Sequence, residues 1–237
     1  MSLEDIEHEL QKLKNPEKAR LLQGFFKTGK GEYGEGDIFL GITVPETRKI
    51  AVKYSRLLSI GEIGELLSSI MHEERLCALL ILIDKYDKGD DNTRKEIFKF
   101  YLDNTKHINN WDLVDLSSHK IIGKWLLDKK KERKLLYQLA KSNDLWEKRI
   151  SIISTFAFIA KNDFFDALKI SETLLNDKND LIHKAVGWAL REIGKKDQKI
   201  EKQFLRKHYK NMPRTMLRYA IEKFPEKLRK QYLNGEI

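Results

Sequence analysis

The chain has little cysteine and little proline. Its 237 residues include one cysteine and four prolines. A single cysteine excludes an intramolecular disulfide and a cysteine-based zinc cluster, and it suits a reducing compartment. That residue, Cys77, lies in an apolar run and is predicted to be a small core residue. Because proline is scarce and strong helix formers such as Leu, Lys, Glu, Ile and Ala dominate, the composition predicts an almost entirely helical protein.

Long apolar runs and metal-ligand patterns are also missing. No apolar run reaches the roughly 18 residues of a membrane span. The first residues are acidic, unlike the apolar core of a signal peptide. We therefore expect a soluble, cytoplasmic protein with no membrane partner, and one domain over residues 1–237. The six histidines include no His-x-x-x-His pair, so we predict no metal site.

Positive charge is concentrated near the carboxyl end. The formal net charge is +9, and residues 195–230 alone contain 13 Lys or Arg against four Asp or Glu. A concentrated basic surface indicates a polyanionic partner, with nucleic acid ahead of an anionic membrane. The alternative is that these lysines only solvate helix faces. Charge therefore indicates where an anion could bind, and not what is done to it.

The amino-terminal part predicts two helices followed by a loop. The helices are expected over Leu3–Leu13 and Glu17–Phe26, with Asn15-Pro16 opening the second. Residues 28–37 include four glycines within eight residues, which predicts a loop. This loop lacks the terminal Gly-Lys-Ser/Thr of a phosphate-binding P-loop. After it, Thr43 and Glu46 have the spacing of a capping box and predict another helix start.

The rest of the chain is a succession of similar helical segments. Segments that begin at Arg75, Arg149, Lys184 and Arg214 can be superimposed, at intervals of 74, 35 and 30 residues, and residues 111–126 fill the longest interval. Helix pairs that repeat every 30–45 residues or so are typical of solenoids. We therefore predict an all-α fold, an α-solenoid of HEAT-like antiparallel helix pairs with a concave basic groove.

Three tryptophans are each followed, one helical turn later, by a charged residue. Residues three or four apart share one face of a helix, so each segment would present an aromatic ring beside a charge. The segments fall on equivalent helices of the predicted repeats and are expected to line the same surface. The pairs are Trp111 with Asp115, Trp146 with Arg149, and Trp188 with Arg191.

Four motifs follow one another along the chain: first Phe39-Leu-Gly-Ile42 with Pro45-Glu46, and then the three tryptophan pairs. In these motifs and their order the chain resembles the AlkD-type alkylpurine DNA glycosylases, a HEAT-like repeat family, over nearly its whole length. The resemblance implies excision of positively charged N3- or N7-alkylated purines from double-stranded DNA by hydrolysis of the N-glycosidic bond. It implies a monofunctional enzyme without a cofactor, and we expect a monomer.

The resemblance also assigns roles to residues. It implies that Asp115 is the catalytic carboxylate, that Trp111 and Trp188 contact the sugar of the lesion, and that Arg149 binds the backbone nearby. Phe25-Phe26 replaces a tyrosine of active family members, and Thr43 replaces a glutamine of one characterised relative. The candidate DNA contacts are Arg191, Lys184, Lys148, Phe25 and Thr43.

The proposed chemistry needs these residue types. An alkylated purine that already carries positive charge is a good leaving group, and positive charge then develops on the deoxyribose as an oxocarbenium ion. A fixed carboxylate stabilises that charge and orients a water, and tryptophan faces attract the cationic sugar. Arginines hold phosphates through charge-assisted hydrogen bonds.

Each assignment has an alternative. Asp115 could be a surface or capping carboxylate, and Arg149 could join neighbouring repeats. Asp112, Trp125 and Trp146 are interpreted as structural. At the level of the whole protein, the alternatives are a non-catalytic HEAT-repeat binder of damaged or branched DNA and a protein-binding scaffold.

Overall fold

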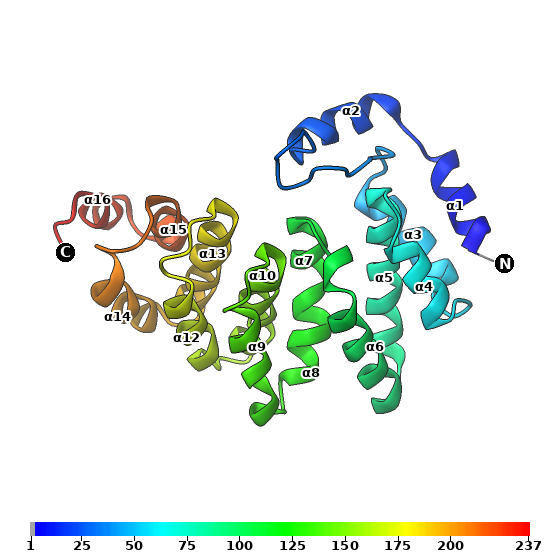
Figure 1. Ribbon diagram of the computed structural model, residues 1–237. Coiled ribbons are helices and arrows are strands. Elements are labelled where there is room, and N and C mark those ends of the chain that lie inside the picture. Colours follow the sequence, from blue (N-terminus) through cyan, green and yellow to red (C-terminus); the bar gives the residue numbers. More distant parts are fainter. Residues whose placement is uncertain (1–2) are drawn as a thin grey trace. The chain divides into compact units, whose positions relative to one another are not determined.

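The computed structural model describes residues 3–237, and these residues are predominantly helical (Figure 1). Within them no β-strand forms, and an isolated bridge joins Ile38 to Met71. The predicted all-α fold is confirmed. The helices divide into two compact units, Met1–Ser117 and Ser118–Ile237. One domain over residues 1–237 and a concave basic groove stay predictions. Over the same residues, no helix combines the length and apolarity that crossing a membrane requires.

Unit 1 is built around one buried helix, α5. Helix α5 packs against α1, α3, α4 and α6. Every residue from Leu76 to Ile83 is buried, so α5 is enclosed over more than two turns. The helices of unit 1 are α1 (Leu3–Lys12), α2 (Pro16–Phe25), α3 (Val44–Tyr54), α4 (Ile60–Leu67), α5 (His72–Lys88), α6 (Asp91–Asp103), the 3-10 turn η1 (Thr105–His107) and α7 (Trp111–Ser118), which reaches the unit boundary.

The capping residues predicted at the starts of α2 and α3 form the expected hydrogen bonds. The side chain of Asn15 accepts a hydrogen bond from the Lys18 N–H at 3.0 Å, and Pro16 opens α2. At α3, the Glu46 carboxylate accepts from the Thr43 N–H at 3.0 Å and from its hydroxyl at 2.6 Å. Both predicted helix starts are confirmed, α2 to within one residue.

The long connection between α2 and α3 requires a glycine at position 41. Gly41 has φ +84°, a left-handed conformation that L side chains rarely adopt. A Cβ atom there would lie 2.2 Å from the Asn15 carbonyl oxygen and 2.6 Å from the Ala19 nitrogen. The glycine of the Phe39–Ile42 motif therefore lets the connection pass directly against the start of α2.

Unit 2 is built around the long helix α13. Helix α13 packs against α10, α14 and α15. A Cβ atom on Gly187 would lie 2.5 Å from the Met216 carbonyl oxygen, so this glycine permits the close approach of α13 and α15. The elements of unit 2 are the π-helix η2 (His119–Gly123), α8 (Lys124–Leu126), η3 (Lys130–Arg133), α9 (Lys134–Leu139), α10 (Leu145–Ser154), α11 (Phe156–Ile159), α12 (Phe165–Thr173), α13 (Asp180–Lys196), α14 (Gln198–His208), α15 (Arg214–Ala220), η4 (Ile221–Lys223) and α16 (Glu226–Asn234).

Candidate functional site

A column of stacked rings lies at the start of α7. The Trp111 ring stacks on Phe26 with centroids 5.0 Å apart and planes 10° apart. Phe26 stacks on Phe39 at 4.8 Å, and Phe39 stacks on the His72 imidazole at 4.3 Å. Phe25 meets Trp111 edge-on at 5.9 Å and is 64% exposed. The Trp111 ring is therefore held by packing within unit 1, since the residue that caps α2, the connection after it and α5 each contribute a ring to the same column.

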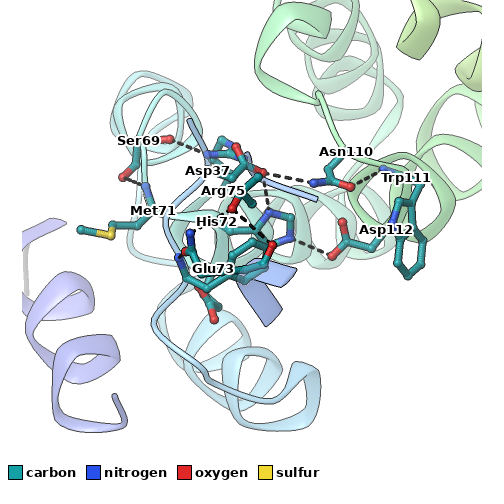
Figure 2. A network of polar contacts seen from close by, with 12 residues as sticks. Asp37, Ser69, Met71, His72, Glu73, Arg75, Asn110, Trp111 and Asp112 are labelled. Atoms are coloured by element: carbon teal, nitrogen blue, oxygen red, sulfur yellow. Dashed lines mark hydrogen bonds and ion pairs between the residues drawn. The ribbon is translucent and has the colours of Figure 1, made fainter. Parts of the chain in front are cut away.

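A polar network lies beside this column (Figure 2). The buried Asp37 carboxylate accepts hydrogen bonds from Arg75 Nη2 at 2.6 Å and from Asn110 Nδ2 at 3.1 Å. His72 Nδ1 lies 3.1 Å from Asp37 Oδ2. On the other side of the same ring, Nε2 lies 2.8 Å from Asp112 Oδ2. The imidazole of His72 thus lies between two carboxylates.

These contacts determine the charge of His72. Burial by itself lowers the pKa of His72, but the Asp112 carboxylate and the hydrogen bonds to Asp112 and Asp37 outweigh burial and raise the pKa to about 9. Burial likewise raises the pKa of Asp37, and the His72 hydrogen bond and the Arg75 charge outweigh it and hold that pKa below its ordinary value. At neutral pH, His72 is therefore an imidazolium that donates from both ring nitrogens.

The raised pKa of His72 makes stability depend on pH. Since the folded pKa of about 9 exceeds the ordinary value of 6.5, the contribution is fully present below about pH 6.5 and is lost as the pH rises through 9. We expect the stabilising contribution to be about 3 kcal/mol, at about 1.4 kcal/mol per pK unit. Urea unfolding between about pH 6 and pH 10 measures it.

Two variants isolate this effect. His72→Gln removes the titrating ring, so the stability difference between wild type and variant is expected to shrink as the pH rises from 6.5 to 9. His8→Gln changes an exposed histidine of α1 and is expected to follow the wild type at every pH. A difference between wild type and His72→Gln that stays constant over this range would show that His72 does not titrate there.

The neighbouring residue on α5, Glu73, fixes the Phe39–Ile42 loop. Its buried carboxylate accepts hydrogen bonds from three consecutive backbone N–H groups, those of Leu40 and Gly41 at 2.8 Å each and that of Ile42 at 3.2 Å. These buried donors would otherwise be unsatisfied. Glu73 therefore holds the loop that brings Phe39 into the ring column.

An apolar cavity opens beside the column. Its volume is about 380 Å³, and its lining includes Phe25, Phe26, Ile42, Thr43 and His72. Two of the predicted DNA contacts, Phe25 and Thr43, thus line the same cavity. The Thr43 hydroxyl is engaged in capping α3, so it is held in place by a local contact.

The predicted catalytic residue, Asp115, lies on α7 four residues after Trp111. Both side chains are partly buried, and their spacing places them on one face of this helix. The structure therefore confirms the helical spacing of the pair. The catalytic role of Asp115 stays a prediction.

Unit 2 carries the other predicted site residues. Arg149 on α10 is buried, and its Nη1 donates to the Leu181 carbonyl at 2.5 Å. Trp188 on α13 is partly buried and donates its indole N–H to Glu192 at 2.9 Å. The Trp188 ring meets Phe156 edge-on at 4.7 Å. Trp146 and Trp125 are buried, in agreement with a structural interpretation.

Three predicted phosphate-binding cations of unit 2 have acidic partners. Lys148 pairs with Asp177 at 2.8 Å, and Lys184 pairs with Asp180 at 2.7 Å. Arg191 pairs with Glu222. To bind a phosphate, each cation would exchange a carboxylate for it or bridge the two. Such exposed or partly exposed pairs are worth about 0–1 kcal/mol, so an exchange costs little.

The sequence did not reveal the polar network. Asp37 and His72 lie 35 positions apart, Asp37 at the end of a glycine-rich loop and His72 at the start of a helix. Neither position belongs to a local pattern. Asp112 was interpreted as structural from its place beside Trp111, and its hydrogen bond to His72 agrees with that interpretation. A histidine at the start of a long buried helix was the one available signal.

Comparisons with known proteins agree with this architecture. The chain is similar to a solved structure described as a predicted DNA alkylation repair enzyme from Enterococcus faecalis, with 16% identity, a TM-score of 0.70 and coverage of 90% of this chain and 97% of that one. It is similar to AlkD2 from Streptococcus mutans, with 18% identity, a TM-score of 0.58 and coverage of 89% and 99%. At these identities the likeness shows the fold. A search of curated proteins finds no match.

A family model establishes the relationship more directly. The model described as DNA alkylation repair enzyme matches residues 6–224. This range spans both units and includes α7 with Trp111 and Asp115, as well as α10 and α13. The chain therefore belongs to the DNA alkylation repair enzyme family.

Proposed function

We propose that this protein is a monofunctional DNA glycosylase that hydrolyses the N-glycosidic bond of positively charged N3- or N7-alkylated purines in duplex DNA. The observation that carries the proposal is the pairing of Trp111 and Asp115 on one face of α7, with the Trp111 ring held in a stacked column. The proposal includes a monomeric enzyme that requires no cofactor.

The reaction needs little general acid catalysis. The alkylated purine carries a positive charge before the bond breaks and leaves as a neutral base. As the bond to the base lengthens, positive charge moves to the deoxyribose. In the proposed mechanism Asp115 stabilises this charge and orients the water that attacks the anomeric carbon. An electrostatic contribution of this kind is worth roughly 3–4 kcal/mol in enzymes.

Trp111 would contribute through its ring face. The negative face of an indole attracts a cationic sugar by about 0.5–2 kcal/mol. Because Phe26 stacks on one face of Trp111, the ring is oriented before DNA arrives. Trp188 is proposed as a second sugar contact, and its hydrogen bond to Glu192 likewise fixes the indole.

DNA binding is proposed to use cations of unit 2. Lys148, Lys184 and Arg191 each pair with a carboxylate that a DNA phosphate would replace at little cost. Arg149 is proposed to act from a fixed position near the backbone, since its guanidinium is anchored to the Leu181 carbonyl. Phe25 and Thr43 are proposed as contacts from unit 1.

Incubation with methylated duplex DNA tests the proposal. We expect release of free 3-methyladenine or 7-methylguanine, measured by chromatography, and DNA left with abasic sites that break on alkali treatment. A strand break without alkali would indicate lyase chemistry and would contradict a monofunctional enzyme. Unmodified duplex of the same sequence is the control and is expected to release no base.

The salt dependence of binding separates the remaining alternatives. Phosphate contacts release counterions, so the logarithm of the binding constant is expected to fall linearly with the logarithm of salt concentration, with a slope of about −0.9 per contacted phosphate. Such a slope without base release would favour a non-catalytic DNA binder. Binding to DNA that is absent or insensitive to salt would favour a protein-binding scaffold.

A further inference from the structure

Helix α7, which carries Trp111 and Asp115, is tethered at its first turn to a buried network. The side chain of Asn110 bridges the two, since its Oδ1 accepts from the Trp111 N–H at 2.8 Å and its Nδ2 donates to Asp37. Asp112 supplies the second tether through its hydrogen bond to His72 Nε2. Both tethers converge on the pair formed by Asp37 and His72 (Figure 2).

We propose that His72 is a positioning residue of the candidate active site: by bridging Asp37 and Asp112 it fixes the first turn of α7 and thereby the Trp111 ring. This inference rests on the proposed function for its catalytic consequence. His72 touches the site in two ways, since its ring also ends the column in which Phe39 and Phe26 lead to Trp111. The same residue therefore holds the turn by hydrogen bonds and the indole by stacking.

The charges around His72 support this role. Asp37 faces it from the connection between α2 and α3, Asp112 faces it from α7, and Arg75 lies near it on its own helix α5. A neutral imidazole has one N–H and could donate to only one of the two carboxylates. The bridge therefore requires the protonated ring, and loss of the proton would release one of the two carboxylates.

A labelling experiment reads the position of Trp111 without any enzyme assay. The chain contains four tryptophans, so 5-fluorotryptophan gives four fluorine resonances, and Trp111→Phe assigns the one of interest. We expect the Trp111 resonance to move with a midpoint near pH 9 in the wild type and to show no such step in His72→Gln. The Trp188 resonance is the internal control. A Trp111 resonance that does not change through pH 9 in the wild type would overturn the inference.

Two substitutions connect the position of Trp111 to catalysis. The amide nitrogen of glutamine can replace Nε2 and reach Asp112, whereas that of asparagine replaces Nδ1 and reaches only Asp37. We expect His72→Asn to slow single-turnover base release by about 10–100-fold with unchanged DNA affinity, because a displacement of about 1 Å can cost 10²-fold. His72→Gln keeps the hydrogen bond to Asp112 but loses the ring and the contact with Asp37, so it is expected to be slowed less than His72→Asn.

The two proposals fail separately. If His72→Asn releases base at the wild-type rate while Asp115→Asn is inactive, the positioning role is wrong and the proposed function stands. If the wild type releases no base, the proposed function is wrong, and the fluorine resonance of Trp111 still decides whether His72 positions it. His8→Gln, on the exposed surface of α1, is the matched histidine control and is expected to leave rate and resonance unchanged.

Discussion

Replacement of Asp115 by asparagine is expected to slow base release from methylated duplex DNA by about 10²–10³-fold. Asparagine keeps the size and hydrogen-bonding shape of the side chain but removes the negative charge that would stabilise the cationic sugar. Because that charge develops only as the bond to the base breaks, the substitution should lower the single-turnover rate and change DNA affinity little. Rates and affinities are measured on the same methylated duplex.

The matched control changes a carboxylate outside α7. Asp103→Asn removes the same charge from an exposed position at the end of α6, and we expect it to release base at the wild-type rate. This control separates a local effect of Asp115 from a change in net charge. If Asp115→Asn releases methylated bases as fast as Asp103→Asn, Asp115 is not the catalytic carboxylate.

Replacement of Glu73 by alanine is expected to reduce the free energy of unfolding by roughly 3–9 kcal/mol. The carboxylate accepts three buried backbone N–H groups, from Leu40, Gly41 and Ile42, and each unsatisfied buried donor costs about 1–3 kcal/mol. Since domains are stable by about 5–15 kcal/mol, a loss of this size approaches global unfolding. Urea and thermal unfolding measure the change.

Two further variants define the cause. Glu73→Gln keeps one acceptor oxygen and is expected to lose less stability than Glu73→Ala. Glu65→Ala removes an exposed carboxylate from α4 and is expected to stay within about 0.5 kcal/mol of the wild type. A Glu73→Ala protein with the stability of Glu65→Ala would mean that the three N–H groups find other acceptors, and that Glu73 does not hold the loop.

Local features of the sequence determined much of the secondary structure. Asn15 and Pro16 fixed the start of α2, and Thr43 with Glu46 fixed the start of α3, because capping depends on residues within one turn of each other. The helical spacing of Trp111 and Asp115 was also predictable, since four residues span about one turn.

Tertiary structure alone decided how these elements are fixed to one another. His72 meets Asp37 across 35 positions of the sequence and Asp112 across 40, and Glu73 meets Gly41 across 32. No helical or turn periodicity links such positions, because their distance depends on the path of the connection between α2 and α3. The sequence by itself determined which residues share a helix face. Only packing, which buries opposite charges together where water cannot screen them, decided that His72 bridges two carboxylates beside Trp111.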